Sequence, residues 1–174
     1  YQGITINVAN GERANSPIGQ DARVRKALSV AIDRDVINQV VFEGAFAAGN
    51  QAYPPTSPWY NAAYPVPTRD VNAARALLAE AGYPDGIDIT VQVANNPVQQ
   101  QLMQVIQAMA GEAGIRITLE AKEFATLLSE QTAGNFIGSQ VGWSGRVDPD
   151  GNIHQFMTTD GGLNDSGYSN AEVD

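Results

Sequence analysis

Cysteine is absent from this sequence of 174 residues, and histidine occurs once, as His154. Without cysteine the chain holds no disulfide, zinc–thiolate site, iron–sulfur cluster or thiol nucleophile. A single histidine also excludes a metal site or a catalytic pair built from several histidines of this chain. We therefore predict neither a metal site nor a cofactor in these residues.

Positive charge is scarce as well. Ten Lys and Arg stand against nineteen Asp and Glu, which gives a formal charge of −9 and a pI near 4.4. A nucleic-acid-binding protein needs a positive surface that displaces counterions, so the composition argues against that role. No apolar run approaches the length that spans a bilayer. The length suits one ordinary domain with a core, or two very small ones.

Three aspartates mark expected helix starts in the first half of the chain. Asp21, Asp33 and Asp70 are suitable N-cap residues, and each precedes apolar residues at helical spacing. The predicted helices cover residues 22–32, 34–42 and 71–81. Residues 45–69 contain five prolines with interleaved tyrosines and a tryptophan, which predicts an ordered but irregular loop.

Alternating apolar residues predict four strands, and helices separate the last three. The strands are expected at residues 1–8, 87–93, 115–119 and 136–143, the helices at 97–114 and 123–131, and a short last helix at 152–157. Crossover helices imply parallel neighbouring strands with right-handed connections. Ligands of such sheets bind beyond the carboxyl ends of the strands, so the segment from Trp143 onward is the first candidate site.

Two short motifs in that segment leave catalysis open as an alternative. Gly142-Trp143-Ser144-Gly145-Arg146 is close to the G-x-S-x-G elbow of hydrolases, but Arg146 replaces the glycine that its tight turn needs. Asp148 and Asp150 form a possible acid–base pair, but turn formation and helix capping beside a proline and a glycine are favoured. A hydrolase using Ser144 or these two carboxylates is the less favoured alternative, and we expect the chain not to be an enzyme.

Longer motifs resemble one known family in order along the whole chain. Residues 21–34 are similar to its D-x-R-V-R-x-A-L-x-x-A-I-D-R signature, and residues 73–86 to A-x-x-L-L-x-E-A-G-Y-x-D-G. Shorter matches follow at residues 114–115, 142–150 and 167–174. The chain resembles the C-terminal lobe of the dipeptide/oligopeptide-type solute-binding proteins of ABC importers, which are the bacterial extracellular solute-binding proteins of family 5.

The resemblance implies an α/β fold: a periplasmic-binding-protein-like lobe of three layers, with a mixed, mostly parallel central sheet flanked by helices. Residues 1–174 are then one lobe of a two-lobed protein, whose partner lobe and C-terminal return segment lie outside this sequence. Both ends of the chain look cut, which agrees with that expectation. The charged residues Arg23, Arg25, Asp33 and Arg34 of the first motif are interpreted as forming local ion pairs and helix caps.

The resemblance also implies that the protein works outside the cytoplasm. Family members close two lobes around a solute and deliver it to an ABC permease in the membrane, either as free periplasmic proteins or as lipoproteins. We expect a small peptide-like or carboxylate-bearing solute. A sensory or chaperone-like binding protein of the same fold is a further alternative.

Five residues are candidates for contact with that solute: Trp143, Ser144, Arg146, Asp148 and Asn7. Trp143 offers a flat apolar wall with one N–H donor, or it packs between helices. Asn7 lies in the expected first strand, as a polar group of the cleft or as a hydrogen-bonding residue of the hinge.

Arg146 departs from the pattern of the family. In peptide-binding relatives the residue three after this tryptophan is typically an aspartate that pairs with the α-amino group of the peptide. An arginine cannot accept a hydrogen bond, and it binds a carboxylate instead. Two alternatives stay open: Arg146 pairs with Asp148 or Asp150, the slightly favoured interpretation, and Asp148 replaces the missing partner of the amine.

Overall fold

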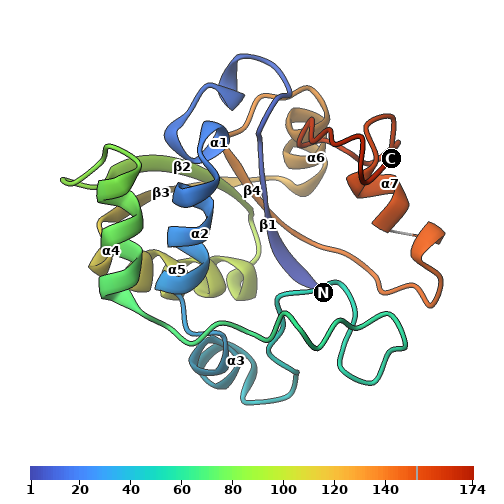
Figure 1. Ribbon diagram of the computed structural model, residues 1–174, viewed down its shortest axis with the longest axis horizontal. Coiled ribbons are helices and arrows are strands. Elements are labelled where there is room, and N and C mark those ends of the chain that lie inside the picture. Colours follow the sequence, from blue (N-terminus) through green and yellow to red (C-terminus); the bar gives the residue numbers. More distant parts are fainter. Residues whose placement is uncertain (152) are drawn as a thin grey trace.

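A four-stranded sheet runs through the protein in the order β1-β4-β2-β3 (Figure 1). Its strands are β1 (Gln2–Ile6), β2 (Ile87–Ala94), β3 (Ile115–Lys122) and β4 (Gly138–Gly142). β2 pairs in parallel with both β3 and β4, whereas β1 pairs antiparallel with β4. The computed structural model, which describes residues 1–151 and 153–174, thus confirms the predicted mixed, mostly parallel sheet.

The helices follow the predicted caps closely. Asp21, Asp33 and Asp70 each accept a hydrogen bond from a backbone N–H two or three residues later. The helices are α1 (Pro17–Gln20), α2 (Ala22–Ala31), α3 (Arg34–Phe42), α4 (Val71–Glu80), α5 (Pro97–Glu112), α6 (Phe124–Thr132) and α7 (Ile153–Met157), with short 3₁₀ turns η1 (Glu12–Ala14) and η2 (Pro149–Gly151). Residue 152, the expected start of the last helix, lies outside the described residues.

The two strands in the middle of the chain have one apolar face and one polar face. Side chains alternate between the faces of a sheet, and the odd-numbered residues of β2 are no more than 3% exposed. The apolar face consists of Ile87, Ile89, Val91, Val93, Ile115 and Ile117. α5 contacts both strands, and its Met103 is buried in the same cluster. The hydrophobic core therefore lies between this face and α5.

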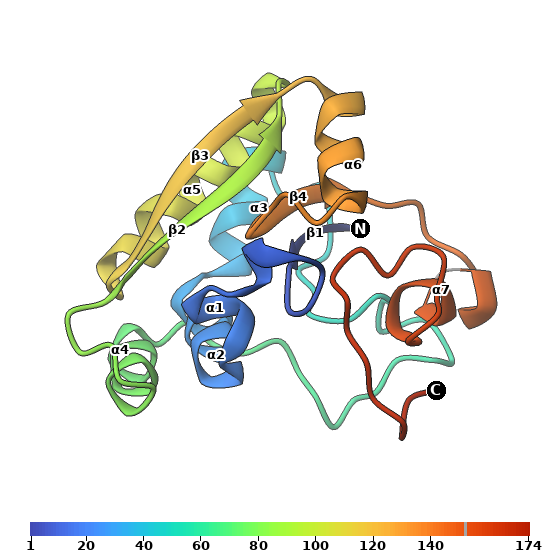
Figure 2. The ribbon, with the colours of Figure 1, turned by 90° about the horizontal axis from the view of Figure 1, so that it is seen from above.

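Helices cover both faces of the sheet, which confirms the predicted three layers. α2 packs against α4 and α5 behind the apolar face. On the polar face, Gln92 Nε2 of β2 donates a hydrogen bond of 3.1 Å to the carbonyl oxygen of Leu127 in α6. Figure 2 shows α5 and α6 on opposite sides of β2 and β3. None of the helices in the described part of the chain combines the length and the apolar character that a membrane span requires.

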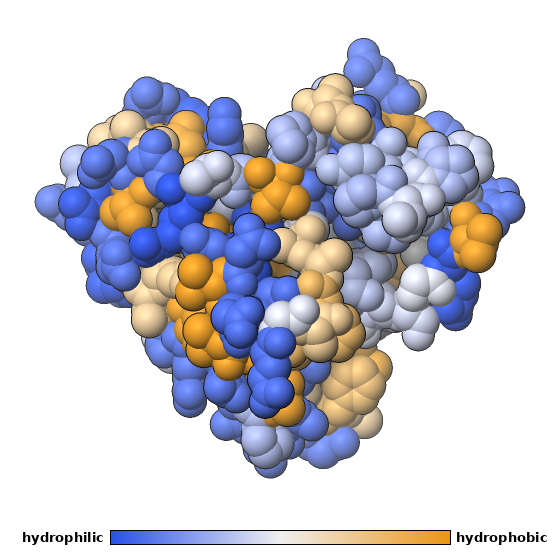
Figure 3. Space-filling view, turned by 90° about the horizontal axis from the view of Figure 1, so that it is seen from below, coloured by the Kyte–Doolittle hydropathy of each residue, from blue (hydrophilic) through white to orange (hydrophobic). Residues whose placement is uncertain are grey.

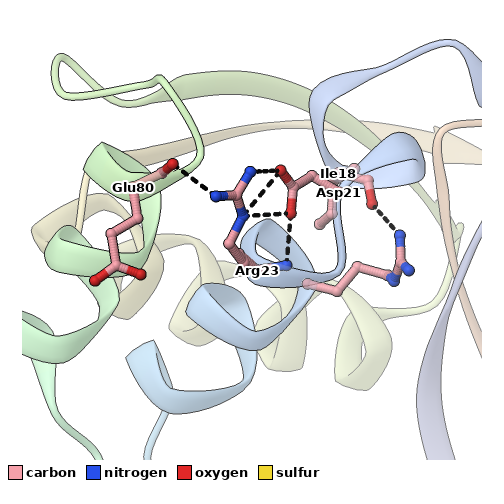
Figure 4. A network of polar contacts seen from close by, with 5 residues as sticks. Ile18, Asp21, Arg23 and Glu80 are labelled. Carbon is pink, nitrogen blue, oxygen red and sulfur yellow. Dashed lines mark hydrogen bonds and ion pairs between the residues drawn. The ribbon is translucent and has the colours of Figure 1, made fainter.

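The first family-like motif builds a junction between α2 and α4 (Figure 4). The Arg23 guanidinium forms an ion pair of 2.6 Å with Asp21 and donates a hydrogen bond of 2.7 Å to the carbonyl oxygen of Glu80. Arg25 and Arg34 instead donate to backbone carbonyl oxygens, at Ile18, Gly19 and Ser29. The motif is thus architectural, as expected, although two of its arginines bind backbone rather than carboxylates.

The second motif ends in a close approach of two backbones. Gly86 and Gly114 have φ angles of +84° and +91°, which side chains rarely allow. A Cβ atom on Gly86 would lie 2.1 Å from the carbonyl oxygen of Gly114. Glycine at residue 86 therefore lets the start of β2 reach the start of β3, with Ile87 N bonded to the Gly114 carbonyl oxygen.

Candidate functional site

The carboxyl end of β4 is the point where the chain leaves the sheet toward the candidate residues. Because Gly138 pairs with Val91, β4 ends near the level of the carboxyl end of β2. Trp143 directly follows β4, and its backbone N–H donates a hydrogen bond of 2.8 Å to the carbonyl oxygen of Tyr1. The segment thus starts from a fixed position at the sheet edge where open α/β proteins bind ligands.

Trp143 is half-buried rather than enclosed. Its ring meets Phe156 of α7 edge to face, with the ring centroids 4.8 Å apart and the planes at 65°. Aromatic pairs prefer this arrangement because the positive edge of one ring faces the negative face of the other. The contact orients the indole and leaves part of its surface accessible. Trp143 therefore packs against a helix and also presents an accessible apolar surface.

Ser144, Arg146 and Asp148 are exposed in the segment after Trp143. The expected ion pair between Arg146 and Asp148 or Asp150 is wrong: no carboxylate of the described residues lies within 4.0 Å of the Arg146 guanidinium. Instead, Arg146 Nη1 donates to the Gly145 carbonyl oxygen at 3.1 Å. Four of its five N–H donors therefore remain available to another acceptor.

Asp148 takes part in the turn that its neighbours predict. Its Oδ1 accepts a hydrogen bond of 3.0 Å from the backbone N–H of Asp150, and η2 follows. One carboxylate oxygen is used in this bond, and the side chain as a whole stays exposed. The Asp148 carboxylate thus has the turn-forming role favoured from the sequence, and Asp150 takes part in the turn through its backbone N–H.

Asn7 lies one residue beyond β1, not within the strand as expected, and it is completely buried. Its Nδ2 lies within hydrogen-bonding distance of the carbonyl oxygens of Asn10, Gly134 and Phe136, and its Oδ1 accepts from Asn10 N. These bonds join the end of β1 to the connection between α6 and β4. The side chain has no exposed surface for a solute, so its position matches the hydrogen-bonding alternative.

Tyr53 belongs to the proline-rich loop, which the sequence predicts to be ordered. Tyr53 is half-buried, and burial raises the pKa of its hydroxyl. The negative charge of Asp148 raises this pKa further. The aromatic content of residues 45–69 indicated an ordered loop, but no local signal connected it to Asp148.

A cavity of about 390 Å³ lies on the polar face of the sheet beside α6. Lys122 on its wall forms ion pairs with Glu120, at 3.2 Å, and with Glu130. Burial lowers the pKa of Lys122, but hydrogen bonds to Glu130 and Glu120 outweigh it and raise the pKa above its usual value. Lys122 offsets one of the two carboxylate charges, and the ion pairs give the polar wall a structural explanation.

Metal-binding chemistry has no geometric support in the part of the chain that the structure describes. Within it, no three His, Cys, Asp or Glu side chains gather closely enough to hold a metal ion. His154 is exposed on α7 and lines a small surface hollow with Asp160 and Asp174.

The crossover-connected sheet, its two helical layers and the exposed segment at its carboxyl edge define an α/β lobe of the periplasmic-binding-protein type. The chain belongs to the bacterial extracellular solute-binding proteins of family 5. The sequence profile of that family, described as "Bacterial extracellular solute-binding proteins, family 5 Middle", matches residues 1–164.

Individual relatives agree with this assignment. The dipeptide-binding protein of Escherichia coli strain K12 is 30% identical over 154 residues, which are 85% of this chain and 29% of that protein. Heme-binding protein A of Haemophilus influenzae is 29% identical over 162 residues, which are 88% of this chain and 30% of that protein.

Solved structures show the same fold. HbpA2 from Haemophilus parasuis superposes with a TM-score of 0.86 at 27% identity, over 98% of this chain and 34% of that one. The periplasmic binding protein DppA from Helicobacter pylori, in complex with the peptide STSA, gives 0.82 at 25% identity, over 98% of this chain and 33% of that one. The chain thus spans about a third of the length of these proteins.

Proposed function

We propose that residues 1–174 form one lobe of an extracytoplasmic solute-binding protein that serves an ABC importer. The membership in family 5 carries this proposal, since the profile covers residues 1–164. In the proposed whole protein, a second lobe closes over the exposed segment after β4, and the closed form delivers the solute to a membrane permease. The protein then works in the periplasm or as a lipoprotein outside the cytoplasmic membrane.

The proposed solute is a small peptide or another molecule that carries a carboxylate. Arg146 supports this choice, because its exposed guanidinium has no carboxylate partner among the described residues and suits a planar anion. Asp148 is the proposed partner of a solute ammonium group. Trp143 supplies an apolar wall and Ser144 a hydroxyl. Asn7 supports the site from within, by holding the chain between β1 and β4.

Binding without catalysis is the better-supported role. In the described part of the chain, no side chain forms a hydrogen bond with Ser144, whereas a serine nucleophile needs an adjacent base. The curated relatives named above are binding proteins by their names. The hydrolase alternative therefore has no geometric observation in its favour.

A thermal-shift experiment on the full two-lobed protein tests the proposal. The probes are trialanine, its N-acetyl derivative, its C-terminal amide and glucose, because a ligand of the folded state raises the unfolding midpoint by mass action. We expect trialanine to raise the midpoint and the amide to raise it less. Arg146→Ala should remove the difference between trialanine and its amide, and Asp148→Asn the difference between trialanine and its N-acetyl derivative.

Arg13→Ala is the matched control, since Arg13 is another exposed arginine and lines the cavity on the polar face. It should respond to all probes as the wild type does. A midpoint that rises only with glucose would contradict the proposed solute class. Equal shifts with trialanine and its amide in the wild type would show that Arg146 does not bind the carboxylate of the peptide.

A further inference from the structure

β1 and β4 lie side by side at the edge of the sheet where the candidate site begins. In their antiparallel register Gln2 lies opposite Gly142, and the Trp143 N–H donates to the Tyr1 carbonyl oxygen at 2.8 Å. Figures 1 and 2 both show the N-terminal end of β1 beside the chain as it leaves β4. Gln2, the first residue of β1, therefore lies next to the segment after β4, although it is far from that segment in sequence.

A buried glutamine of β4 orients the side chain of Gln2. Gln140 is only 2% exposed, and its Nε2 donates a hydrogen bond of 2.8 Å to Gln2 Oε1. A buried amide needs such a bond, but replacing both bonded groups by apolar ones of the same shape is close to neutral for stability. The stability of the sheet alone therefore does not explain why two glutamines are paired here.

Glycine at residue 142 leaves room for the Gln2 amide. A Cβ atom on Gly142 would lie 2.7 Å from Gln2 Nε2 and 2.9 Å from Gln2 Oε1. The amide thus lies against the backbone of the last residue of β4, directly before Trp143. A side chain at residue 142 would displace the amide from this position.

The Gln2 amide has hydrogen-bonding capacity that the described residues do not use. Its Nε2 carries two N–H donors, and no acceptor in residues 1–151 or 153–174 is bonded to either of them. The side chain is exposed, so a solute can reach it. Because Oε1 accepts from Gln140, the free groups of the amide are donors, and the complementary group of a solute is a carbonyl oxygen.

Other exposed side chains offer less specific chemistry. Figure 3 shows the face that includes α3 and the proline-rich loop, where apolar atoms lie among polar ones. The exposed apolar side chains of α3 are Val36 and Val40, with Phe46 beyond the helix. These side chains have no hydrogen-bonding group with which to select a polar solute. Gln2 has an oriented donor and lies where the chain leaves the sheet.

We propose that Gln2 is a further solute-binding residue, whose Nε2 donates a hydrogen bond to a main-chain carbonyl oxygen of a bound peptide. Gln140 is a positioning residue that acts through Gln2. This inference rests on the proposed function and deepens it, because it adds a contact with the peptide backbone to those of the charged ends with Arg146 and Asp148. The contact depends neither on the side chains of the peptide nor on its terminal carboxylate.

Isothermal titration calorimetry on the full two-lobed protein, with trialanine and its C-terminal amide, tests the contact. Gln2→Met removes the donor and should weaken the binding of both peptides by the same factor, about two- to tenfold, which is the range of a hydrogen bond between neutral groups. An ionised Gln2→Glu side chain still accepts from Gln140 but cannot donate, so it should weaken binding at least as much. Gln104→Met is the matched control, since Gln104 is an exposed glutamine in the middle of α5, and it should bind both peptides as the wild type does.

A double-mutant cycle tests the role of Gln140. Gln140→Met should weaken peptide binding in the wild-type background and have no further effect in Gln2→Met, because it acts through the Gln2 amide. Equal losses in both backgrounds would overturn the positioning role of Gln140. Unfolding midpoints without ligand show whether each variant is folded.

The outcomes separate this inference from the function on which it rests. If trialanine binds the wild type and Gln2→Met leaves its affinity unchanged, the assignment of Gln2 is wrong and the proposed function stands. Wild-type affinity in Gln2→Glu would also overturn the assignment, because that variant lacks the donor. A loss confined to trialanine, without one for its amide, would show that Gln2 does not bind a main-chain carbonyl oxygen. If neither peptide binds the wild type, the proposed solute class fails and the inference fails with it.

Discussion

The β2–α5–β3 unit and the loops around the carboxyl end of β4 are built in opposite ways. In the first, alternating isoleucines and valines are withdrawn from water against α5. In the second, residues 45–69 and 143–151, the backbone is irregular and polar and aromatic side chains stay accessible. Buried apolar area stabilises the first region, whereas short-range hydrogen bonds and prolines shape the second. Stability and the candidate site therefore reside in separate parts of one fold.

Local hydrogen bonds also have different structural roles in the two regions. Around the core, Asp70 caps α4, and Arg75 donates to the Glu112 carbonyl oxygen at the end of α5. These bonds satisfy helix ends that packing alone would leave unpaired. In the loops, Gln51 and Asp148 bind backbone atoms of turns instead. The loops are therefore ordered without contributing much apolar burial.

Removing a core side chain should give the largest difference in stability between the two regions. Ile115 is completely buried at the start of β3, so Ile115→Ala loses apolar burial and leaves a cavity. We expect the free energy of unfolding, measured in urea, to fall by about 2–5 kcal/mol. Val147→Ala is the control in the loops, where the side chain is 91% exposed, and should change it by less than about 0.5 kcal/mol. Equal losses would contradict the division into two regions.

A pair of glycine substitutions measures how strongly the backbone is constrained in each region. Gly86→Ala places a methyl group against the Gly114 carbonyl oxygen at a positive φ, and should lower the free energy of unfolding by about 1–3 kcal/mol. Gly145→Ala is matched to it in the loops, because no atom lies within 4 Å of the added Cβ. Its unfolding midpoint should stay close to that of the wild type. A larger effect at Gly145 would mean that the loop backbone is the more constrained one.

The smallest effect concerns pH. Hydrogen bonds from the Arg23 side chain and backbone lower the pKa of Asp21 from 3.8 to about 2 in the folded protein. A lowered carboxyl pKa contributes stability that is present above the unfolded value and is lost as the pH falls from about 3.8 toward 2. Asp21→Asn keeps a capping side chain but should lack this dependence.

Urea midpoints of both proteins at pH 7, and at several values below 4, measure the difference. The wild type should lose more of its stability than Asp21→Asn across the acid range, by a small amount because the pair is exposed. Parallel pH profiles would show that the Asp21–Arg23 pair has no net effect.

Much of the fold could be predicted from the sequence because the deciding interactions are local. The caps at Asp21, Asp33 and Asp70 bond to residues two or three positions away. The alternation in residues 87–93 likewise reflects one strand with one buried face. Strand ends were less accurate: β1 ends before Asn7 and β4 before Trp143, since the length of a strand depends on where a partner is available.

The candidate site was predictable in its location but not in its contacts. Crossover connections placed Trp143 and the residues after it at the carboxyl edge of the sheet. The expected pairing of Arg146 with its acidic neighbours was wrong, because closeness in sequence does not make two side chains of a turn face each other. The antiparallel position of β1 also depends on pairing across the chain, from Gln2 to Gly142.

The α/β class, the helix starts, the family-like motifs and the absence of thiol and multi-histidine chemistry can all be read from the sequence. These follow from short-range spacing and composition. The strand order and the burial of Asn7 depend instead on the tertiary structure. Each of those depends on contacts between residues far apart in the chain, and such contacts form only when the whole apolar core closes.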